Sequence, residues 1–383
     1  MDDATRLLQA TLTEAKQGTA MHSGPVFAAP FHAIGDASGV AYTYARAHNP
    51  TWTELEHAIS GLEGAGREDV KTLVFPSGMA AIAAVMGAVL RPGDAAVLPS
   101  NAYYVARQLM QKYFTEMGVE LRMAPTANNA QGALLEGAKL LWLETPSNPT
   151  MEICDIAALC KQAHKAGALV AVDNSTQTAL SQKPLLLGAD FSVASDAKSM
   201  SGHSDILYGH VAVKDTALAD KLQAWRRLSG SILGPMEAWL ALRSLATLPL
   251  RLERSSQNAM KIAEFMQTRK DVTDVLYPGL KTHPDHALAV KQQKYFGAVL
   301  SFTLRDAETA NKFLANAKLI TEATSFGSVV TTGERRARWG GDVIAPGFVR
   351  LSAGCEAVED LIADIAQALE CCAHGESAPG AQK

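Results

Sequence analysis

The sequence lacks several features that mark particular classes of protein. No stretch is apolar for the roughly 20 residues that a membrane-spanning helix needs. No block of lysine and arginine occurs and the formal net charge is -4, which argues against nucleic acid or a membrane surface as a partner. No Gly-x-Gly-x-x-Gly motif follows an early strand, which argues against a nicotinamide-dependent dehydrogenase.

Cysteine is also scarce. The five cysteines are an odd number and contain no Cys-x-x-Cys pair, so no metal site is predicted and a reduced, cytoplasmic protein is the simpler interpretation. Cys154 and Cys160 are expected to be buried free thiols. The first residues are acidic and no apolar run follows them, so no secretory signal is expected.

The length and composition favour a chain of two domains. The 383 residues include 48% hydrophobic and 19% charged residues, enough for a sizeable core. We expect an N-terminal arm over residues 1–50 that starts with a short helix around 5–16, a larger domain over 51–235 and a smaller C-terminal domain over 236–374. The tail, 375–383, is rich in Gly, Ser and Ala and is predicted to be disordered.

The larger domain alternates short apolar runs with Ala/Leu-rich segments of helical spacing, such as 80–90 and 155–166. Fully apolar strands alternating with helices predict an α/β fold with a mainly parallel sheet covered on both faces. The expected strands are 73–75, 95–98, 140–143, 169–172, 191–193 and 211–213. After residue 235, expected helices (237–247, 255–269) and strands (297–302, 348–352) indicate an α+β domain.

A lysine and an acid stand where ligands bind in such sheets, beyond the carboxyl ends of the strands. Asp173 ends the apolar run 169–172, and Lys198 follows the next expected strand, which ends near Ser195. Pyridoxal 5'-phosphate (PLP) requires such a pair, because a lysine amine bonds covalently to its aldehyde while a carboxylate keeps its ring nitrogen protonated. The pair therefore predicts a PLP site.

The segment around this lysine resembles the active-site region of the Cys/Met-metabolism family of PLP-dependent enzymes. Members carry Ser-x-Thr-Lys followed by Gly-His-Ser/Ala-Asp, and an upstream Asp-Asn. Ser195, Lys198, the run 202–205 and Asp173 with its neighbouring asparagine match, whereas Ala197 replaces the usual threonine. The resemblance implies the PLP-dependent transferase fold of type I, with Lys198, Asp173 and Ser195 at the cofactor.

Two further motifs resemble the family's phosphate-binding segments. Ser-Gly-Met precedes an Ala-rich helix, and the resemblance implies that the backbone amides of Gly78 and Met79 bind the cofactor phosphate. The dipole at a helix N-terminus favours binding of such an anion. Tyr44 and Arg46, in Tyr-x-Arg-x-x-Asn-Pro-Thr, correspond to residues that reach the phosphate of the neighbouring subunit. The guanidinium fork of an arginine suits a phosphate. The match implies at least an obligate dimer, and the family resemblance favours a homotetramer built from two dimers.

Other residues acquire roles only through the resemblance. Asn148, in the run 144–150, corresponds to an asparagine beside the phenolic oxygen of PLP and the substrate carboxylate. Tyr103 lies about ten residues after Pro-Gly-Asp and corresponds to the tyrosine stacked on the cofactor ring, with Tyr104 as the alternative. The phenol of that tyrosine is expected to take part in proton transfer.

Near the C-terminus, Arg350 in Val-Arg-Leu-Ser matches the arginine that binds the substrate α-carboxylate. An arginine inside an apolar strand also requires an anionic partner on physical grounds. Ser325 is expected to touch cofactor or substrate, and Thr324 before it does not match the residue that usually distinguishes substrates. The run 334–341 resembles a subset of cystathionine γ-lyase-like members.

The family resemblance implies an enzyme of sulfur amino-acid metabolism. We expect a carbon-sulfur lyase that cleaves cystathionine by γ-elimination to cysteine, 2-oxobutanoate and ammonia. The alternatives are β-elimination, which yields homocysteine and pyruvate, and γ-replacement on an acylated homoserine. From a different class, a protein of this fold that binds or regulates without turnover is disfavoured, because binding alone needs no proton-shuttling lysine.

Overall fold

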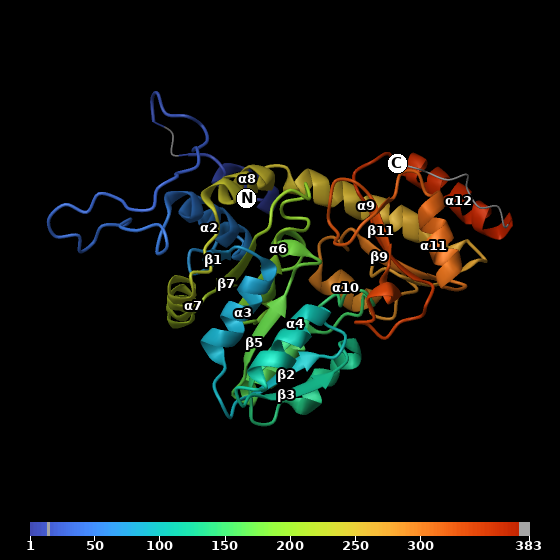
Figure 1. Cartoon of the computed structure of the whole chain (residues 1–383), viewed down its shortest axis with the longest axis horizontal. Coiled ribbons are helices and arrows are strands. Elements are labelled where there is room, and N and C mark those ends of the chain that lie inside the picture. Colours follow the sequence, from blue (N-terminus) through green and yellow to red (C-terminus); the bar gives the residue numbers. More distant parts are fainter. Residues whose placement is uncertain (14–15, 375–383) are drawn as a thin grey trace. The chain divides into compact units, whose positions relative to one another are not determined.

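The computed structural model describes residues 1–13 and 16–374, so the tail predicted to be disordered lies outside the described residues. The chain forms two compact units (Figure 1). The N-terminal unit contains Met1–Thr145 and Cys154–Pro249, and the C-terminal unit contains Pro146–Ile153 and Leu250–Lys383. Each unit is described by itself below.

The boundary between the units differs from the expected one at residues 235/236. Helix α8 (Pro235–Leu245) begins there and packs against α2 (Pro50–Glu63). Contact with α2 keeps α8 in the N-terminal unit. The short segment 146–153 also differs from the expected division. It follows a strand of the N-terminal unit but belongs to the C-terminal unit.

A seven-stranded sheet forms the centre of the N-terminal unit, in the order β1-β7-β6-β5-β4-β2-β3. Neighbouring strands from β3 through β6 are parallel, whereas β7 is antiparallel to both β6 and β1. The predicted α/β class with a mainly parallel sheet is therefore confirmed. The strands are β1 (Lys71–Phe75), β2 (Ala95–Pro99), β3 (Glu120–Ala124), β4 (Ala138–Glu144), β5 (Leu169–Asp173), β6 (Phe191–Ser195) and β7 (Gly209–Val213).

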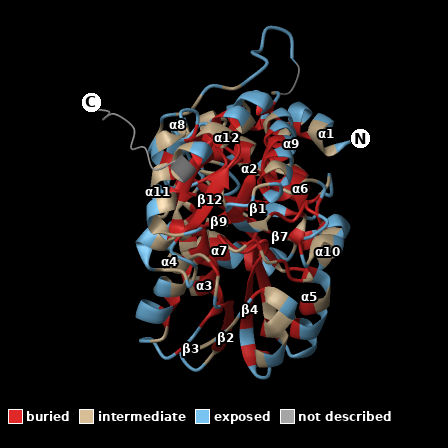
Figure 2. Ribbon diagram, turned by 90° about the vertical axis from the view of Figure 1, so that its right-hand side faces the viewer, coloured by how far each residue is buried: buried red, intermediate tan, exposed pale blue. Residues whose placement is uncertain are grey.

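The strands from β7 to β2 are buried on both faces, as Figure 2 shows by the red strands beneath the helices, whereas the edge strand β3 is partly exposed. Alternate residues of β4 point to opposite faces. Leu140 and Trp142 join the apolar cluster of α3 (Gly78–Val89), while Leu141 and Leu143 join that of α5 (Ile156–Lys165). The remaining helices of the unit are α1 (Asp3–Ala10), α4 (Tyr104–Leu109), α6 (Thr178–Ser181), α7 (Thr216–Ser229), one π-helical turn (Met110–Phe114), two 3-10 segments (Ala127–Leu134, Pro184–Leu187) and the start of α9 (Leu248–Gln267).

The C-terminal unit is a smaller α+β unit, as predicted. Its five-stranded sheet has the order β10-β11-β12-β9-β8 and is antiparallel except between β10 and β11. Helices α9, α11 and α12 bury their apolar faces in one cluster with β9 and β12. The elements are β8 (Val272–Leu276), α10 (His286–Gln292), β9 (Val299–Leu304), α11 (Ala307–Asn316), β10 (Thr321–Glu322), β11 (Thr332–Arg335), a 3-10 turn (Arg336–Trp339), β12 (Phe348–Ser352) and α12 (Val358–His374).

The arm differs in detail from its prediction. Helix α1 begins after Asp2, whose side chain accepts a hydrogen bond from the Ala4 amide, and it ends well before Lys16. Much of the following segment projects from the rest of the N-terminal unit as irregular chain (Figure 1). In the described part of the chain, no helix combines the length and the apolar character that crossing a membrane requires.

The contact between α3 and α7 leaves no room for a side chain at Gly87. A Cβ built there would lie 2.1 Å from ring carbons of Trp225. Alanine normally stabilises a helix by about 1 kcal/mol relative to glycine, but overpacking of a core costs about 1–3 kcal/mol. We expect Gly87→Ala to lower the free energy of unfolding by about 1 kcal/mol or more, measured by urea denaturation.

Gly61 in α2 provides the matched control, because a Cβ there would meet no atom within 4 Å. Gly61→Ala should be neutral or stabilising by up to about 1 kcal/mol. Equal stability of the two variants would mean that Trp225 moves aside at little cost.

Candidate active site

Three residues expected at the site gather at one edge of the large sheet. Asp173 is the last residue of β5 and Ser195 is the last residue of β6. These strands are parallel neighbours, with Asp173 opposite Val193, so their carboxyl ends share an edge. Lys198 lies in the turn that follows β6 directly.

A short chain of hydrogen bonds joins the ends of β5 and β6. One oxygen of Asp173, Oδ1, accepts hydrogen bonds from the Ser175 amide at 3.0 Å and the Ser175 hydroxyl at 2.6 Å. The same hydroxyl accepts a hydrogen bond from the Ser195 amide at 2.7 Å. Burial raises the pKa of the Asp173 carboxyl, while the Ser175 bonds and the charge of Lys198 oppose this shift.

The turn that carries Lys198 is anchored by its backbone to the residue that precedes β7. The amides of Asp196 and Ala197 both donate to the carbonyl of Tyr208, at 3.0 and 3.2 Å. The Lys198 carbonyl accepts a hydrogen bond from the Gly202 amide at 2.8 Å. Lys198 itself is half-buried. The backbone of the turn therefore holds the lysine beside the sheet edge.

The N-terminus of α3 lies directly against this turn. The Ser77 hydroxyl caps the helix by accepting from the Ala80 amide at 3.1 Å, and Gly78 and Met79 begin its first turn. A Cβ on Gly78 would lie 2.4 Å from the Cβ of Ser195, so only glycine permits this approach. First-turn amides have no acceptor within their own helix and can bind an anion.

Tyr103 and Tyr104 lie at the start of α4. The amide of Tyr103 donates to Oε2 of Glu144, the last residue of β4, at 2.7 Å. The two tyrosine rings pack edge to face with centroids 5.3 Å apart. Glu144 stands opposite Asp173 in the sheet, which brings this tyrosine pair to the same sheet edge.

Tyr44 and Arg46 lie on the arm. The Arg46 guanidinium donates to the carbonyl of Arg227 in α7 at 2.9 Å and lies over the Tyr44 ring, 5.6 Å from its centroid. The Tyr44 side chain is exposed. These two residues thus lie together on the exposed arm, whereas Asp173, Ser195 and Lys198 lie at the sheet edge.

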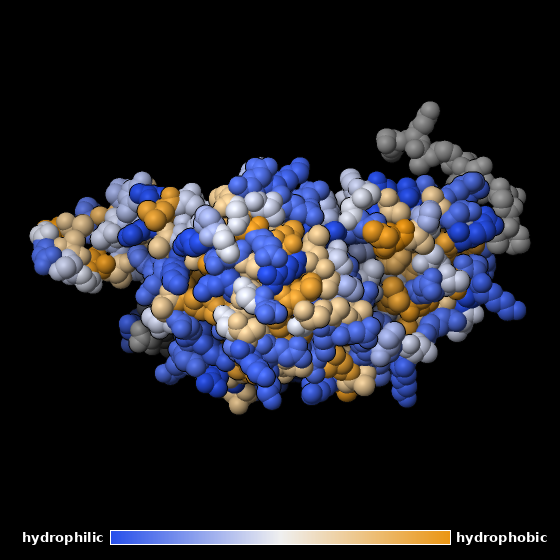
Figure 3. Space-filling model, turned by 90° about the horizontal axis from the view of Figure 1, so that it is seen from below, coloured by the Kyte–Doolittle hydropathy of each residue, from blue (hydrophilic) through white to orange (hydrophobic). Residues whose placement is uncertain are grey.

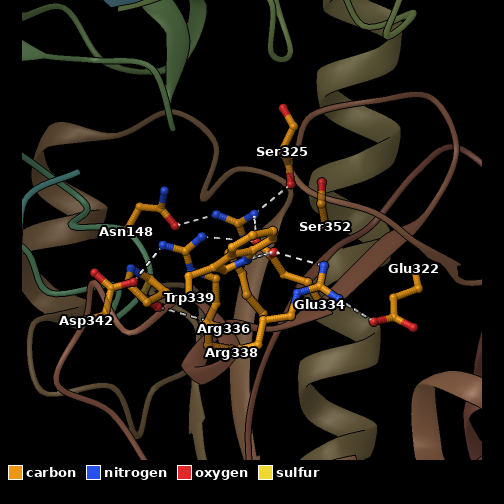
Figure 4. A network of polar contacts seen from close by, with 12 residues as sticks. Asn148, Glu322, Ser325, Glu334, Arg336, Arg338, Trp339, Asp342 and Ser352 are labelled. Atoms are coloured by element: carbon orange, nitrogen blue, oxygen red, sulfur yellow. Dashed lines mark hydrogen bonds and ion pairs between the residues drawn. The ribbon is translucent and has the colours of Figure 1, made fainter. Parts of the chain in front are cut away.

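The remaining site residues come together in the C-terminal unit, around Arg350 of β12 (Figure 4). The Arg350 guanidinium donates to Oδ1 of Asn148 at 2.8 Å and to the carbonyl of Ser325 at 2.8 Å. It also lies over the Phe326 ring, 5.4 Å from the centroid. Ser325 has φ +77°, a strained backbone conformation for serine that is typical of functional sites. Arg350, Asn148 and Ser325 therefore form one cluster.

Sequence reasoning missed the acid that pairs with Arg350. Glu334 is fully buried in β11, directly opposite Arg350 in β12, and forms an ion pair with it. In the sequence, Glu334 stands out only as the first residue of the run 334–341. A buried arginine signals that an anion is near, but identifying the partner requires the register between two strands.

A second missed group is a buried histidine between two acids. His210 of β7 forms hydrogen bonds with Oδ2 of Asp196 at 2.6 Å and with Oε1 of Glu63 at 3.0 Å. All three side chains are buried. Burial alone would lower the pKa of His210, but the charges and hydrogen bonds of the two acids outweigh burial and raise the pKa to about 10.

The donor set of the N-terminal unit fits PLP. The first turn of α3 offers backbone amides to a phosphate, and the absence of a Cβ at Gly78 lets this turn lie against Ser195. Asp173 supplies a buried carboxyl at the sheet edge, and Lys198 supplies an amine in the adjoining turn. Phosphate, ring nitrogen and aldehyde each have a chemically suitable partner in this set.

Comparison with known proteins decides the family. The model of the family described as Cys/Met metabolism PLP-dependent enzyme matches residues 8–370. The chain belongs to this family. Members of the Cys/Met metabolism family depend on PLP, so the cofactor predicted from Lys198 and Asp173 is confirmed, and the chain is a PLP-dependent carbon-sulfur lyase.

Similar members of the Cys/Met metabolism family carry several names. A protein of Streptomyces coelicolor described as a putative cystathionine gamma-lyase is 50% identical over 96% of this chain and 93% of its own length. A cystathionine beta-lyase of Lactococcus lactis is 38% identical over 86% of this chain and 88% of its own. A cystathionine gamma synthase of Xanthomonas oryzae, solved with cystathionine, is 34% identical with a TM-score of 0.92, covering 97% of this chain and 99% of that one.

The pKa of His210 predicts a loss of stability at alkaline pH. Because its pKa is raised from 6.5 to about 10 in the folded protein, its favourable contribution is complete below pH 6.5 and disappears as the pH rises through about 10. His210→Gln removes this contribution. The thermal midpoint should therefore fall less steeply between pH 6.5 and about 10 in the variant than in the unmodified enzyme.

His164→Gln is the control, because His164 also pairs with an acid, Asp190 at 2.9 Å, but is exposed. This variant should retain the pH profile of the unmodified enzyme. A His210→Gln profile that is parallel to the unmodified one would show that His210 does not hold its proton at alkaline pH.

Proposed function

We propose that this lyase cleaves cystathionine by γ-elimination to cysteine, 2-oxobutanoate and ammonia, in the transsulfuration branch of methionine and cysteine metabolism. The observation that carries the proposal is 50% identity, over 96% of the chain, to a protein described as a putative cystathionine gamma-lyase. The residues gathered at the sheet edge and around Arg350 supply the groups that this reaction needs.

Lys198 is proposed as the residue that moves protons. Bound PLP supplies an electron sink for the carbanion that forms at the α-carbon of the substrate. The Lys198 amine, partly withdrawn from water, would remove the α-proton and release it again before it takes a second proton from the β-carbon, which it would pass to the thiolate that leaves the γ-carbon. Water would then release 2-oxobutanoate and ammonia. Asp173 holds a proton at the ring nitrogen by its negative charge.

The phosphate of the cofactor is proposed to lie at the N-terminus of α3. The amides of Gly78 and Met79 and the hydroxyl of Ser195 face this position from two sides, which the close approach of Gly78 to Ser195 supports. Ala197 supplies no hydroxyl, so Ser195 serves that side alone. The ring of Tyr103 stacks on the cofactor, with Tyr104 as the alternative, and its phenol assists proton transfer.

Arg350 is proposed to bind the α-carboxylate of the substrate. A guanidinium offers a carboxylate two parallel charge-assisted hydrogen bonds. Asn148 and Ser325 hold the same guanidinium and are proposed to contact substrate or cofactor beside it. Fixing the carboxylate in this way orients the α-carbon for proton removal.

The protein is proposed to be a cytoplasmic homotetramer, a dimer of dimers. The projecting arm exposes large apolar side chains, and part of its surface is apolar in the space-filling view (Figure 3, left). The exposed apolar side chains of the arm are Met21, Phe27, Ile34, Val40 and Tyr44. Exposed apolar side chains favour contact with another subunit. Tyr44 and Arg46 would then reach the phosphate of the neighbouring subunit.

The reaction is tested by incubating the PLP-loaded protein with L-cystathionine and identifying the keto acid by mass spectrometry. We expect 2-oxobutanoate. Pyruvate would instead establish β-elimination, which the 38% identity to a cystathionine beta-lyase keeps as a second candidate. Formation of neither acid would exclude both, and an assay with an acylated homoserine and a thiol would then test γ-replacement.

The role of Lys198 is tested with Lys198→Ala. We expect loss of keto-acid formation by at least about a thousandfold, because the variant lacks both the covalent attachment and the proton carrier. The visible absorption of bound cofactor should shift at unchanged thermal stability. Residual turnover close to that of the unmodified protein would contradict this role.

The shared site is tested by mixing two inactive variants, Arg46→Ala and Lys198→Ala, after mild dissociation of the subunits. If Arg46 serves the neighbouring site, a mixed dimer contains one site with both residues intact, so activity should reappear on mixing. A mixture that exchanges subunits but stays inactive would place Arg46 outside the neighbour's site.

A further inference from the structure

The buried acid Glu334 has no part in the reaction as proposed, yet it touches the arginine assigned to the substrate. Glu334 lies in β11 and Arg350 in β12, at opposite positions of an antiparallel pair. Oε1 of Glu334 accepts a hydrogen bond from Nη2 of Arg350. Both side chains are almost completely inaccessible to water, with relative exposures of 1% and 4%.

Three acceptors, from Asn148, Ser325 and Glu334 (labelled in Figure 4), contact the guanidinium of Arg350. Asn148 Oδ1 accepts from Nη1 at 2.8 Å, and the Ser325 carbonyl and Glu334 both accept from Nη2. Only Glu334 among these three carries a charge. Because a guanidinium is planar, three acceptors in different directions fix both its position and the orientation of its plane.

Glu334 is itself held in place by its other neighbours. Its Oε2 accepts a hydrogen bond from the indole of Trp339 at 2.9 Å, and Arg338 lies 3.6 Å from the same oxygen. Arg336 lies 3.2 Å from Oε1 and also pairs with Asp342 at 2.6 Å. Both oxygens of the Glu334 carboxylate therefore have partners other than Arg350, and these partners hold the carboxylate in place.

We propose that Glu334 is a positioning residue, which orients the guanidinium of Arg350 so that it can bind the α-carboxylate of an amino-acid substrate. The proposal rests on the assignment of Arg350 to that carboxylate. A guanidinium donates its hydrogen bonds within its own plane, so a rotated guanidinium presents its remaining N–H groups less well to the substrate carboxylate.

The direction in which the KM changes when Glu334 is replaced distinguishes a positioning role from a role as a simple counter-charge. If Glu334 acted only as a counter-charge, its neutralisation would leave more positive charge for the substrate carboxylate, and the KM would fall. If Glu334 positions Arg350, its loss lets the guanidinium turn, and the KM rises. Binding energy used alike in the ground and transition states alters KM while kcat stays constant.

Two substitutions test the proposal in the PLP-loaded enzyme. Glu334→Gln retains the length of the side chain and removes its charge, whereas Glu334→Asp retains the charge and shortens the reach. We expect both to raise the KM for cystathionine by about tenfold, with kcat within about twofold. Glu334→Asp alone decides the question if Glu334→Gln does not fold.

A binding measurement isolates the carboxylate. L-alanine and L-alaninamide differ in the carboxylate, and their binding is followed by the change in absorption of the bound cofactor. The unmodified enzyme should favour L-alanine, and both Glu334 variants should lose about tenfold of that preference. Unchanged preference in both variants, or a lower KM in Glu334→Gln, would overturn the proposal.

Asp342→Asn provides the matched control. Asp342 is another acid of the same network, with a largely buried side chain, and its ion pair is with Arg336. This variant should retain the KM and the preference for L-alanine. If its KM rises and its preference for L-alanine falls as much as in the Glu334 variants, the effect belongs to the whole network and the positioning role is rejected.

Arg350→Lys distinguishes failure of this proposal from failure of the function on which it rests. A large loss of carboxylate preference in Arg350→Lys, with none in the Glu334 variants, rejects only the role of Glu334. Unchanged preference in Arg350→Lys would show that Arg350 does not bind the carboxylate, and it would reject both.

Discussion

A charge that is withdrawn from water must meet a partner, and the active-site region of this chain is built around that constraint. Asp173, His210 and Arg350 are all buried, and each contacts groups of suitable polarity or charge. Ser175 and Lys198 compensate Asp173, two acids compensate His210, and Glu334 compensates Arg350. Each partner restricts the position of the group that it neutralises.

The parallel sheet makes such a concentration of polar groups possible. Strands β4, β5 and β6 run side by side with apolar residues along both faces, and they end in Glu144, Asp173 and Ser195. Because the carboxyl ends of these strands lie side by side, the three polar residues stand at one end of the sheet and do not interrupt the apolar core. The glycine at the start of α3 then allows a helix N-terminus to lie against the end of β6. A helix N-terminus with first-turn amides and an acid are thereby brought to one edge.

The turn that carries Lys198 differs from the sequence pattern of its family at one residue. The structure shows which contacts hold the turn around that residue. Ala197 lacks the usual hydroxyl, while Asp196 beside it reaches back to His210 and, through it, to Glu63. The turn is therefore held by backbone hydrogen bonds to the carbonyl of Tyr208, just before β7, and by an ionic side-chain contact with His210 in β7. These contacts restrain the backbone that carries the lysine.

The sequence by itself determined the alternation of strands and helices, the family, the cofactor and the motifs that end on Asp173, Ser195 and Lys198. These features are readable because apolar runs, caps and short motifs are local along the chain. The edge strand β3 escaped prediction because charged residues alternate along it, and α1 is shorter than its pattern suggested. Only the tertiary structure decided that Asn148 belongs with Arg350, that Glu334 faces Arg350 and that Glu63 meets His210. Such pairs depend on strand register and on packing between distant segments, which no local pattern encodes.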